Sequence, residues 1–210
     1  MRAYELALVA LGVGLPGATA EHELAPPVDV KVYVTGAILV PRAELLTAEA
    51  TAGTLFAHID VRTAWIEGKP TIANAANSEM VIHVRFERRP RETCTSEALA
   101  YTMPFLKGRK TITVLPDRIR RVASSTCSEQ CILGYVLAHE LTHTLQRSNQ
   151  HAETGVMKAA WDRQDNIAMG KGLLDFTPAD VELIRVGLTT SASATSNNEE
   201  VSSSHSGRPH

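Results

Sequence analysis

This sequence has no excess of basic over acidic residues. Its 210 residues contain 21 lysines and arginines and 23 aspartates and glutamates, which gives a formal net charge of -2 at pH 7. Proteins that bind nucleic acid need a basic surface, because lysine and arginine neutralise the phosphates. The short basic cluster at residues 88–91 contains Pro90 and is interpreted as a solvated turn. We therefore expect no nucleic-acid partner.

The sequence also lacks a long apolar run. A transmembrane helix needs about 18 apolar residues in succession, and no segment has them. At the N-terminus, Arg2 precedes a shorter apolar run at residues 6–15 and the small residues Ala18-Thr19-Ala20. This pattern predicts a signal peptide over residues 1–20. The mature protein is then expected to be secreted, periplasmic or otherwise extracytoplasmic, with no stable membrane anchor.

Cysteine is scarce, with three residues in the chain. An exported protein meets an oxidising compartment, in which one disulfide and one remaining thiol are the simplest arrangement. We expect Cys94 to pair with Cys127 or Cys131, which would attach the start of a helix to the preceding sheet. A zinc site made of these cysteines is disfavoured, because their spacing fits zinc knuckles poorly.

The pattern of apolar residues indicates one α+β domain, which we place at residues 21–188. Its hydrophobic content of 44% is enough to bury a sizeable core. Strands are predicted at 28–34, 61–66, 80–86, 98–103 and 111–115, and helices at 42–58, 128–147 and 178–188. Thr177 is the expected N-cap of the last helix. Residues 189–210 have almost no apolar side chains and are predicted to form a disordered polar tail.

The motif His139-Glu140-Leu141-Thr142-His143 lies within the predicted helix at 128–147. Two histidines four residues apart project from the same face of a helix, so their rings can bind one metal ion. Zn²⁺ prefers such nitrogen ligands. Glu140 follows the first ligand and is placed beside the metal, where a general base for a water molecule is needed. The motif therefore predicts two zinc ligands, His139 and His143, and a catalytic Glu140.

A catalytic zinc site normally has a third protein ligand and one open position. Three residues of the sequence are candidates for the third zinc ligand. His151 follows a segment, Ser148-Asn149-Gln150, that lets the chain turn back toward the helix. Glu153 lies two residues further on, and Glu182 in the last helix would be the distant carboxylate of a thermolysin-like site. We favour His151, with Glu182 as the alternative.

The motif, the nearby downstream histidine and Gly155-Val156-Met157 together resemble the metzincin zinc metalloproteases. The resemblance implies a mixed twisted sheet packed on a long active-site helix, followed by a C-terminal helix. It assigns His139, His143 and His151 to zinc, Glu140 to catalysis, and Met157 to the turn below the metal. It covers residues 136–157 directly. Ser148, Asn149, His151, Gly155, Met157 and Trp161 further resemble a peripheral branch of exported bacterial proteins.

The resemblance has three departures. The usual third ligand would fall at position 149, which is asparagine, and the usual turn glycine at 146, which is glutamine. The tyrosine that assists some metzincins would fall at Ala159. We expect a secreted zinc metalloendopeptidase that binds a peptide or protein substrate along the strand at 111–115. The alternative is an exported zinc-binding domain that binds a partner with weak or no catalysis.

Overall fold

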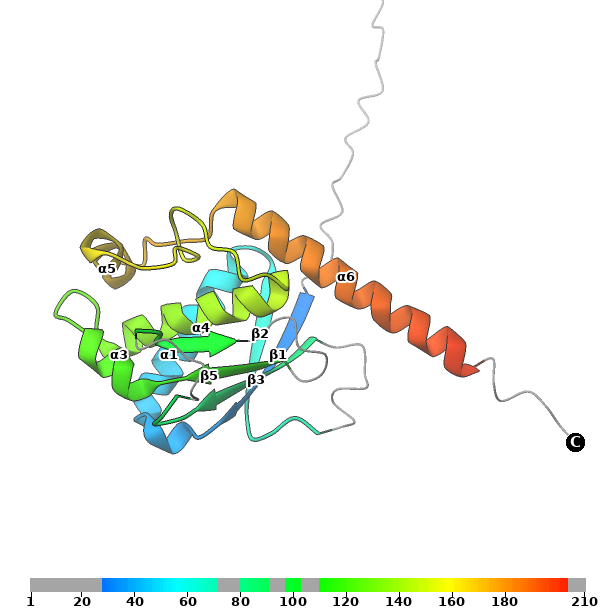
Figure 1. Cartoon of the computed structure of the whole chain (residues 1–210), viewed down its shortest axis with the longest axis horizontal. Helices are drawn as coiled ribbons and strands as arrows, with labels where there is room; N and C mark the ends of the chain where they lie inside the picture. The colour runs from blue at the N-terminus through cyan, green and yellow to red at the C-terminus, as the bar shows by residue number, and fades with distance from the viewer. Residues whose placement is uncertain (1–27, 72–79, 91–96, 103–109, 204–210) are drawn as a thin grey trace, which may run out of the picture.

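The structure is a computed structural model of the chain, and it describes residues 28–71, 80–90, 97–102 and 110–203. Side chains are described as far as Thr190. The predicted signal peptide at 1–20 and Cys94 lie outside the described residues. The described part has an α+β fold in which one mixed sheet is packed against helices (Figure 1).

In the described residues the sheet has five strands, in the order β2-β1-β3-β5-β4. Strands β1, β2, β3 and β5 are parallel, and β4 is antiparallel to β5. Their bounds are close to the predicted ones: β1 Val28–Thr35, β2 Val61–Glu67, β3 Met80–Phe86, β4 Ala100–Thr102 and β5 Thr111–Val114. The valines at alternate positions of β1, Val30, Val32 and Val34, are almost completely buried. The period-2 pattern therefore identified the core face of the sheet.

The edge of the sheet differs from the prediction. The strand at 111–115 was expected to border the substrate, but β5 lies between β3 and β4 and has no free edge. The shorter β4 is the outermost strand on that side. The hydrophobic pattern of a strand does not reveal its place in the sheet. That place depends on which other strands it pairs with, and these lie elsewhere in the sequence. The expectation for 111–115 is therefore wrong, and the edge belongs to β4.

Of the helices in the described residues, three were predicted and two were not. The predicted helices are α1 Arg42–Ala57, α4 Glu129–Gln146 and α6, which begins at Pro178. The unpredicted ones are α3 Pro116–Val122 and α5 Arg163–Gly170, and a short 3₁₀ turn, η1, spans Ala37–Leu39. No helix in the described part of the chain is long and apolar enough to cross a membrane.

The N-terminus of helix α5 is capped by an uncommon pair of side chains. The Asp162 side chain accepts hydrogen bonds from the backbone N–H of Gln164 and of Asp165, at 2.7 and 3.1 Å. The Asp165 carboxylate accepts in return from the Asp162 N–H at 2.8 Å. This is a capping box built from two aspartates instead of Ser or Thr with Glu. The same spacing could have identified α5 from the sequence.

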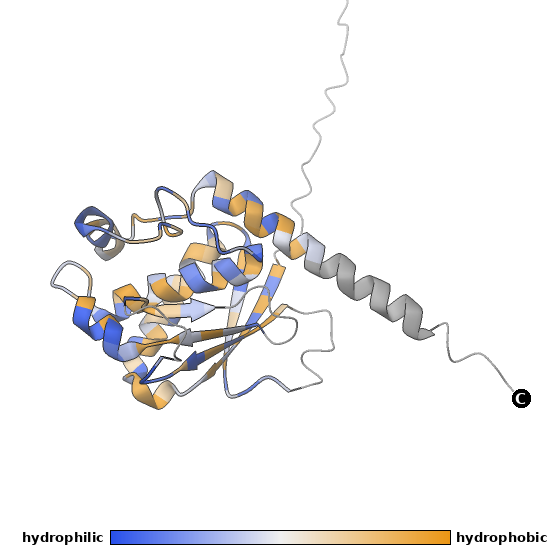
Figure 2. Cartoon of the chain, in the orientation of Figure 1, coloured by the Kyte–Doolittle hydropathy of each residue, from blue (hydrophilic) through white to orange (hydrophobic). Residues whose placement is uncertain are grey.

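Helix α4 is the central element of the core. It packs against α1, β4 and α6, and Figure 2 shows apolar residues along α4 and along the strands of the sheet. Leu137, Leu141 and Leu145 are at most 1% exposed. Their spacing of four residues gives one fully apolar face, as predicted for an amphipathic helix. The opposite face is left for the histidines.

Helix α6 closes the core beside α4, as its apolar spacing predicted. Thr177 caps its first turn: the Thr177 Oγ1 accepts from the Asp180 N–H at 3.2 Å, and the Asp180 carboxylate accepts from the Thr177 N–H at 2.9 Å. Ile184 is fully buried. At Gly187 a Cβ atom would lie 1.9 Å from the Leu145 carbonyl oxygen, so only glycine allows the two helices to approach this closely.

The chain beyond Leu188 is also different from the prediction. Helix α6 continues to Ser203, so residues 189–203 of the predicted disordered tail are helical. This part contains neither proline nor glycine. Once the first turns are fixed by packing, each added residue costs little, and Ala, Ser and Glu extend a helix without burying apolar surface. Composition alone is a poor guide to such an extension.

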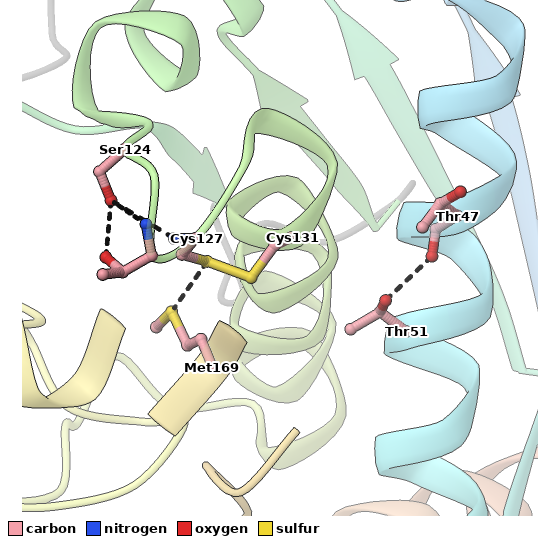
Figure 3. Close-up of a disulfide and its surroundings, with 7 residues drawn as sticks. Thr47, Thr51, Ser124, Cys127, Cys131 and Met169 are labelled. Atoms are coloured by element: carbon pink, nitrogen blue, oxygen red, sulfur yellow. Dashed lines mark hydrogen bonds between the residues drawn. A yellow bond between two sulfur atoms is a disulfide. The ribbon is translucent and has the colours of Figure 1, made fainter. Parts of the chain in front are cut away.

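The disulfide pairing is a third correction. Cys127 is bonded to Cys131 and not to Cys94 (Figure 3). Cys127 lies just before the N-cap Ser128, where the chain bends into the helix and brings the two Cα atoms to 5.5 Å, a normal disulfide separation. The Cys127 sulfur also contacts the Met169 sulfur of α5 at 4.0 Å. The bond therefore fixes the entry of α4 and its contact with α5.

Candidate metal centre

The two motif histidines lie on the polar face of α4, and their rings meet as predicted. The Nε2 atoms of His139 and His143 are 3.0 Å apart, and the Nε2 atoms of His143 and His151 are 3.3 Å apart. One nitrogen from each of the three rings lies within 4.8 Å of the others. Nitrogens that share a tetrahedral zinc ion at about 2.05 Å lie about 3.3 Å from one another. The three histidines can therefore hold a metal ion.

The opposite ring nitrogens show which tautomer is present. The Nδ1–H of His139 donates to the Val156 carbonyl at 2.9 Å, and the Nδ1–H of His143 donates to the Ser148 carbonyl at 2.8 Å. A carbonyl oxygen carries no proton, so each Nδ1 must carry it. In the neutral ring, Nε2 is then left with a lone pair. Both lone pairs point into the shared space, where a cation is the favourable occupant.

Burial keeps these rings neutral. It lowers the pKa of His139 to about 4, with the neighbouring His143 and His151 acting in the same direction against the Val156 hydrogen bond. Burial is also the main cause that lowers the pKa of His143, and His151 adds to it. A metal ligand must be deprotonated. The two helix histidines are therefore ready to bind a cation at neutral pH.

The segment after α4 explains how His151 reaches the cluster. The helix runs through Gln146, the position of the turn glycine in the resembling family, and ends at Arg147, which has a φ of 53°. The Arg147 and Ser148 N–H groups both donate to the His143 carbonyl, which closes the last turn. The chain thus turns one residue later than in the family pattern. This longer path accommodates the later position of His151.

Of the three candidates for the third metal ligand, only His151 lies close to His139 and His143. Among the described residues, the three histidines are the one group of potential ligands that lie close enough to share a metal. Glu153 and Glu182 are exposed and belong to no such group. Asn149 lines the same cleft but supplies neither imidazole nor carboxylate. The structure therefore brings His151, and neither glutamate, to the two helix histidines.

Arg147 is an exposed residue in a conformation that favours glycine, and this gives a stability prediction. Arg147→Gly removes the steric cost of the left-handed conformation and also the repulsion that Arg147 exerts on Lys110. We expect the free energy of unfolding to rise by about 0.5–1 kcal/mol. Arg147→Ala is the matched control, because it removes the charge and retains the Cβ atom. Urea denaturation of both variants measures the difference, and equal stabilities would contradict the prediction.

The segment of the predicted methionine turn is linked to the histidines through the Val156 carbonyl, which accepts from His139. Met157 and Val156 are fully buried. Gly155 has a φ of 78°, and a Cβ atom there would lie 2.6 Å from the Asp175 carbonyl oxygen, so both conformation and space require glycine. That carbonyl accepts the Val156 N–H at 3.1 Å. The turn is thereby held in the position from which the Val156 carbonyl orients His139.

Glu140 points into the same region but is not a member of the ligand group. It is 8% exposed, and its Oε2 has no hydrogen-bond partner. Burial raises the pKa of the Glu140 carboxyl to about 8. An unpartnered buried carboxyl is costly, and a nearby cation or a bound water relieves the cost. This orphan oxygen beside three converging nitrogens fits a metal site.

A cleft of about 660 Å³ contains the histidines and Glu140. Its walls come from elements that sequence analysis did not associate with the site: residues 97–102 at β4, Val122 of α3 and Asn166 of α5. Ala159 and Trp161 complete the rim, and the Trp161 ring stands edge-on to His139 with centroids 5.6 Å apart. Tyr135, one turn before His139, is 2% exposed and belongs to the core. It is therefore not available to replace the tyrosine absent at position 159.

No protein-family model matches this chain, and no similar sequence is found among curated proteins. The site must therefore be interpreted from its own geometry and chemistry.

Proposed function

We propose that this protein is a zinc metallopeptidase. The observation that carries the proposal is the convergence of nitrogens from three histidines near a buried carboxyl whose Oε2 has no hydrogen-bond partner, inside an open cleft. A purely structural zinc site is usually closed by four protein ligands and has no need of a carboxylate beside it. The five-stranded mixed sheet and the central α4 are compatible with the zincin-like fold that the resemblance implies.

In this proposal His139, His143 and His151 hold the metal, and the Val156 and Ser148 carbonyls fix the orientation of the first two rings. When bound, zinc supplies Lewis-acid activation of water and of a carbonyl group. Glu140 accepts the proton of the attacking water and later transfers it to the leaving amine. Met157 and Gly155 shape the floor on which these groups rest. The burial of Glu140 keeps competing solvent away from its carboxyl.

The substrate would lie extended beside β4. Among the described residues β4 pairs on one side only, with β5, and its residues line the cleft. A peptide can add to such an edge through main-chain hydrogen bonds, which require no particular sequence. The scissile carbonyl would then lie between the edge strand and the helix that carries the histidines.

A second candidate is a zinc-binding domain that holds a partner without turnover. Ala159 favours it, because no phenol is present at that point to stabilise a developing negative charge. The buried Glu140 favours the peptidase. Both candidates bind zinc, so a measurement of metal content cannot distinguish them. A measurement of peptide cleavage can, because only the peptidase has turnover.

The deciding experiment is a combined metal and peptidase assay on the purified full chain. We expect about one zinc per chain by elemental analysis and cleavage of an unfolded protein such as casein. A chelator should abolish cleavage, and added zinc should restore it. Stoichiometric zinc without any cleavage would favour the binding domain, and absence of zinc binding would refute both candidates.

A further inference from the structure

The cleft has an apolar end that the metal chemistry does not use. Along α4, Val136 lies one turn before Glu140, and Ile132 lies one turn before Val136, so all three face the cleft. Leu99, just before β4, and Val122, at the end of α3, form the other walls. Val122 is 48% exposed, although it is a large apolar residue, so this wall is open to a bound molecule. The shape suggests a place for a substrate side chain.

The length of this end restricts which side chain fits. Ile132 precedes His139 by seven residues, which corresponds to about 10 Å along a helix. A peptide that crosses the metal site beside β4 can fill this space only with a long side chain. Methionine, lysine and arginine have the long unbranched stem that this space requires.

Glu97 supplies a charge at this end of the cleft. It is exposed, lines the cleft next to Ala98, and forms no ion pair or hydrogen bond with the described residues. The neighbouring Arg118 is engaged by the Ala98 carbonyl, to which its Nη1 donates at 2.6 Å. Lys158, the basic residue of the cleft lining, is held by Asp162 and Asp165 at 2.6 and 2.7 Å. The Glu97 carboxylate is therefore available to a cation from outside.

We infer that this cleft selects substrates with a lysine or arginine side chain near the cleaved bond. The apolar stem of that side chain packs on Val122 and Leu99, and its charged end reaches the Glu97 carboxylate. A long apolar side chain would fill the same space but would leave the carboxylate without a partner. The inference rests on the proposed function, because it names the substrate class of the same site.

The test uses peptides that differ in one side chain. In a fixed peptide whose cleavage site is mapped by mass spectrometry, lysine, norleucine or glutamate is placed in turn at the three positions on each side of the cleaved bond. Norleucine provides the stem of lysine without its charge. At one position we expect kcat/KM to fall about two- to fivefold from lysine to norleucine, the usual size of an exposed ion pair, and further to glutamate. High salt should reduce the difference, because the pair is solvent-accessible.

Variants of Glu97 complete the test. Glu97→Gln should cleave lysine and norleucine peptides equally, and Glu97→Lys should favour glutamate. Glu182→Gln, an exposed change outside the cleft, should retain the lysine preference. Cleavage at equal rates for all side chains, or a preference that survives in Glu97→Gln, would overturn the inference and leave the peptidase proposal intact. If no peptide is cleaved, the proposed function itself has failed.

Discussion

Replacement of Glu140 by glutamine is expected to abolish peptide hydrolysis and to leave zinc bound. Glutamine has the shape of glutamate, but its amide cannot accept the proton of an attacking water. Loss of a general base typically lowers kcat by about 10²- to 10⁴-fold. The metal should remain, because the three potential ligand atoms belong to histidines. Casein cleavage and zinc stoichiometry, measured on the same preparation, check both halves of the prediction.

The fold should tolerate this change. With the pKa of Glu140 raised to about 8, the carboxyl of the metal-free chain is mostly neutral at pH 7, so a neutral amide replaces a neutral acid. We therefore expect no loss of free energy of unfolding in the metal-free Glu140→Gln chain. Glu182→Gln is the control, because Glu182 is an exposed acidic residue outside the cleft. Full activity in Glu140→Gln would reject the assigned role, whereas loss of zinc would show that Glu140 is a ligand.

Replacement of His151 by alanine is expected to weaken zinc binding severely. The variant leaves two ligands, both on α4, and opens the site to solvent. Loss of a partner that only orients a ligand costs roughly 10- to 100-fold in affinity, and loss of a ligand itself should cost more. Competition with a chromogenic chelator measures the dissociation constant. Hydrolysis should fall in parallel, since the bound metal is required.

Asn149→Ala is the matched control for this experiment. Asn149 lies on the same segment, is also exposed and lines the same cleft, and it occupies the third-ligand position of the resembling family. We expect it to retain zinc with nearly unchanged affinity. Because His151 is exposed, the metal-free His151→Ala chain should unfold at the same denaturant concentration as the unchanged protein. Equal zinc affinity in the His151 and Asn149 variants would show that the ligand assignment is wrong.

The way in which α4 ends explains why Gln146 and Asn149 depart from the metzincin motif that the sequence resembles. Gln146 occupies the place of the turn glycine and donates from its Nε2 to the Asp180 carbonyl of α6 at 3.2 Å. The turn lies at Arg147, and the added length returns the chain to the histidine cluster at His151 instead of position 149. This path brings the His151 ring to the two helix histidines.

Local patterns predicted the parts of the molecule that depend on neighbours in the sequence. The alternating valines of β1, the apolar spacing of α4 and the Thr177 cap of α6 each involve residues within a few positions. The placement of His139, Glu140 and His143 on one helical face follows from 3.6 residues per turn. These features were therefore confirmed without correction.

Long-range contacts determined the rest. The order of β5 and β4 at the sheet edge, the approach of α6 to α4 at Gly187, and the walls of the cleft join residues far apart in the chain. The pairing of Cys127 with Cys131 depends on the bend before α4, which the spacing of cysteines does not specify. Sequence by itself determined that His139 and His143 can share a metal ion, because helical periodicity is local. Only the tertiary structure decided that His151 completes the group and that Glu97 shares its cleft, because both depend on where the chain returns in space.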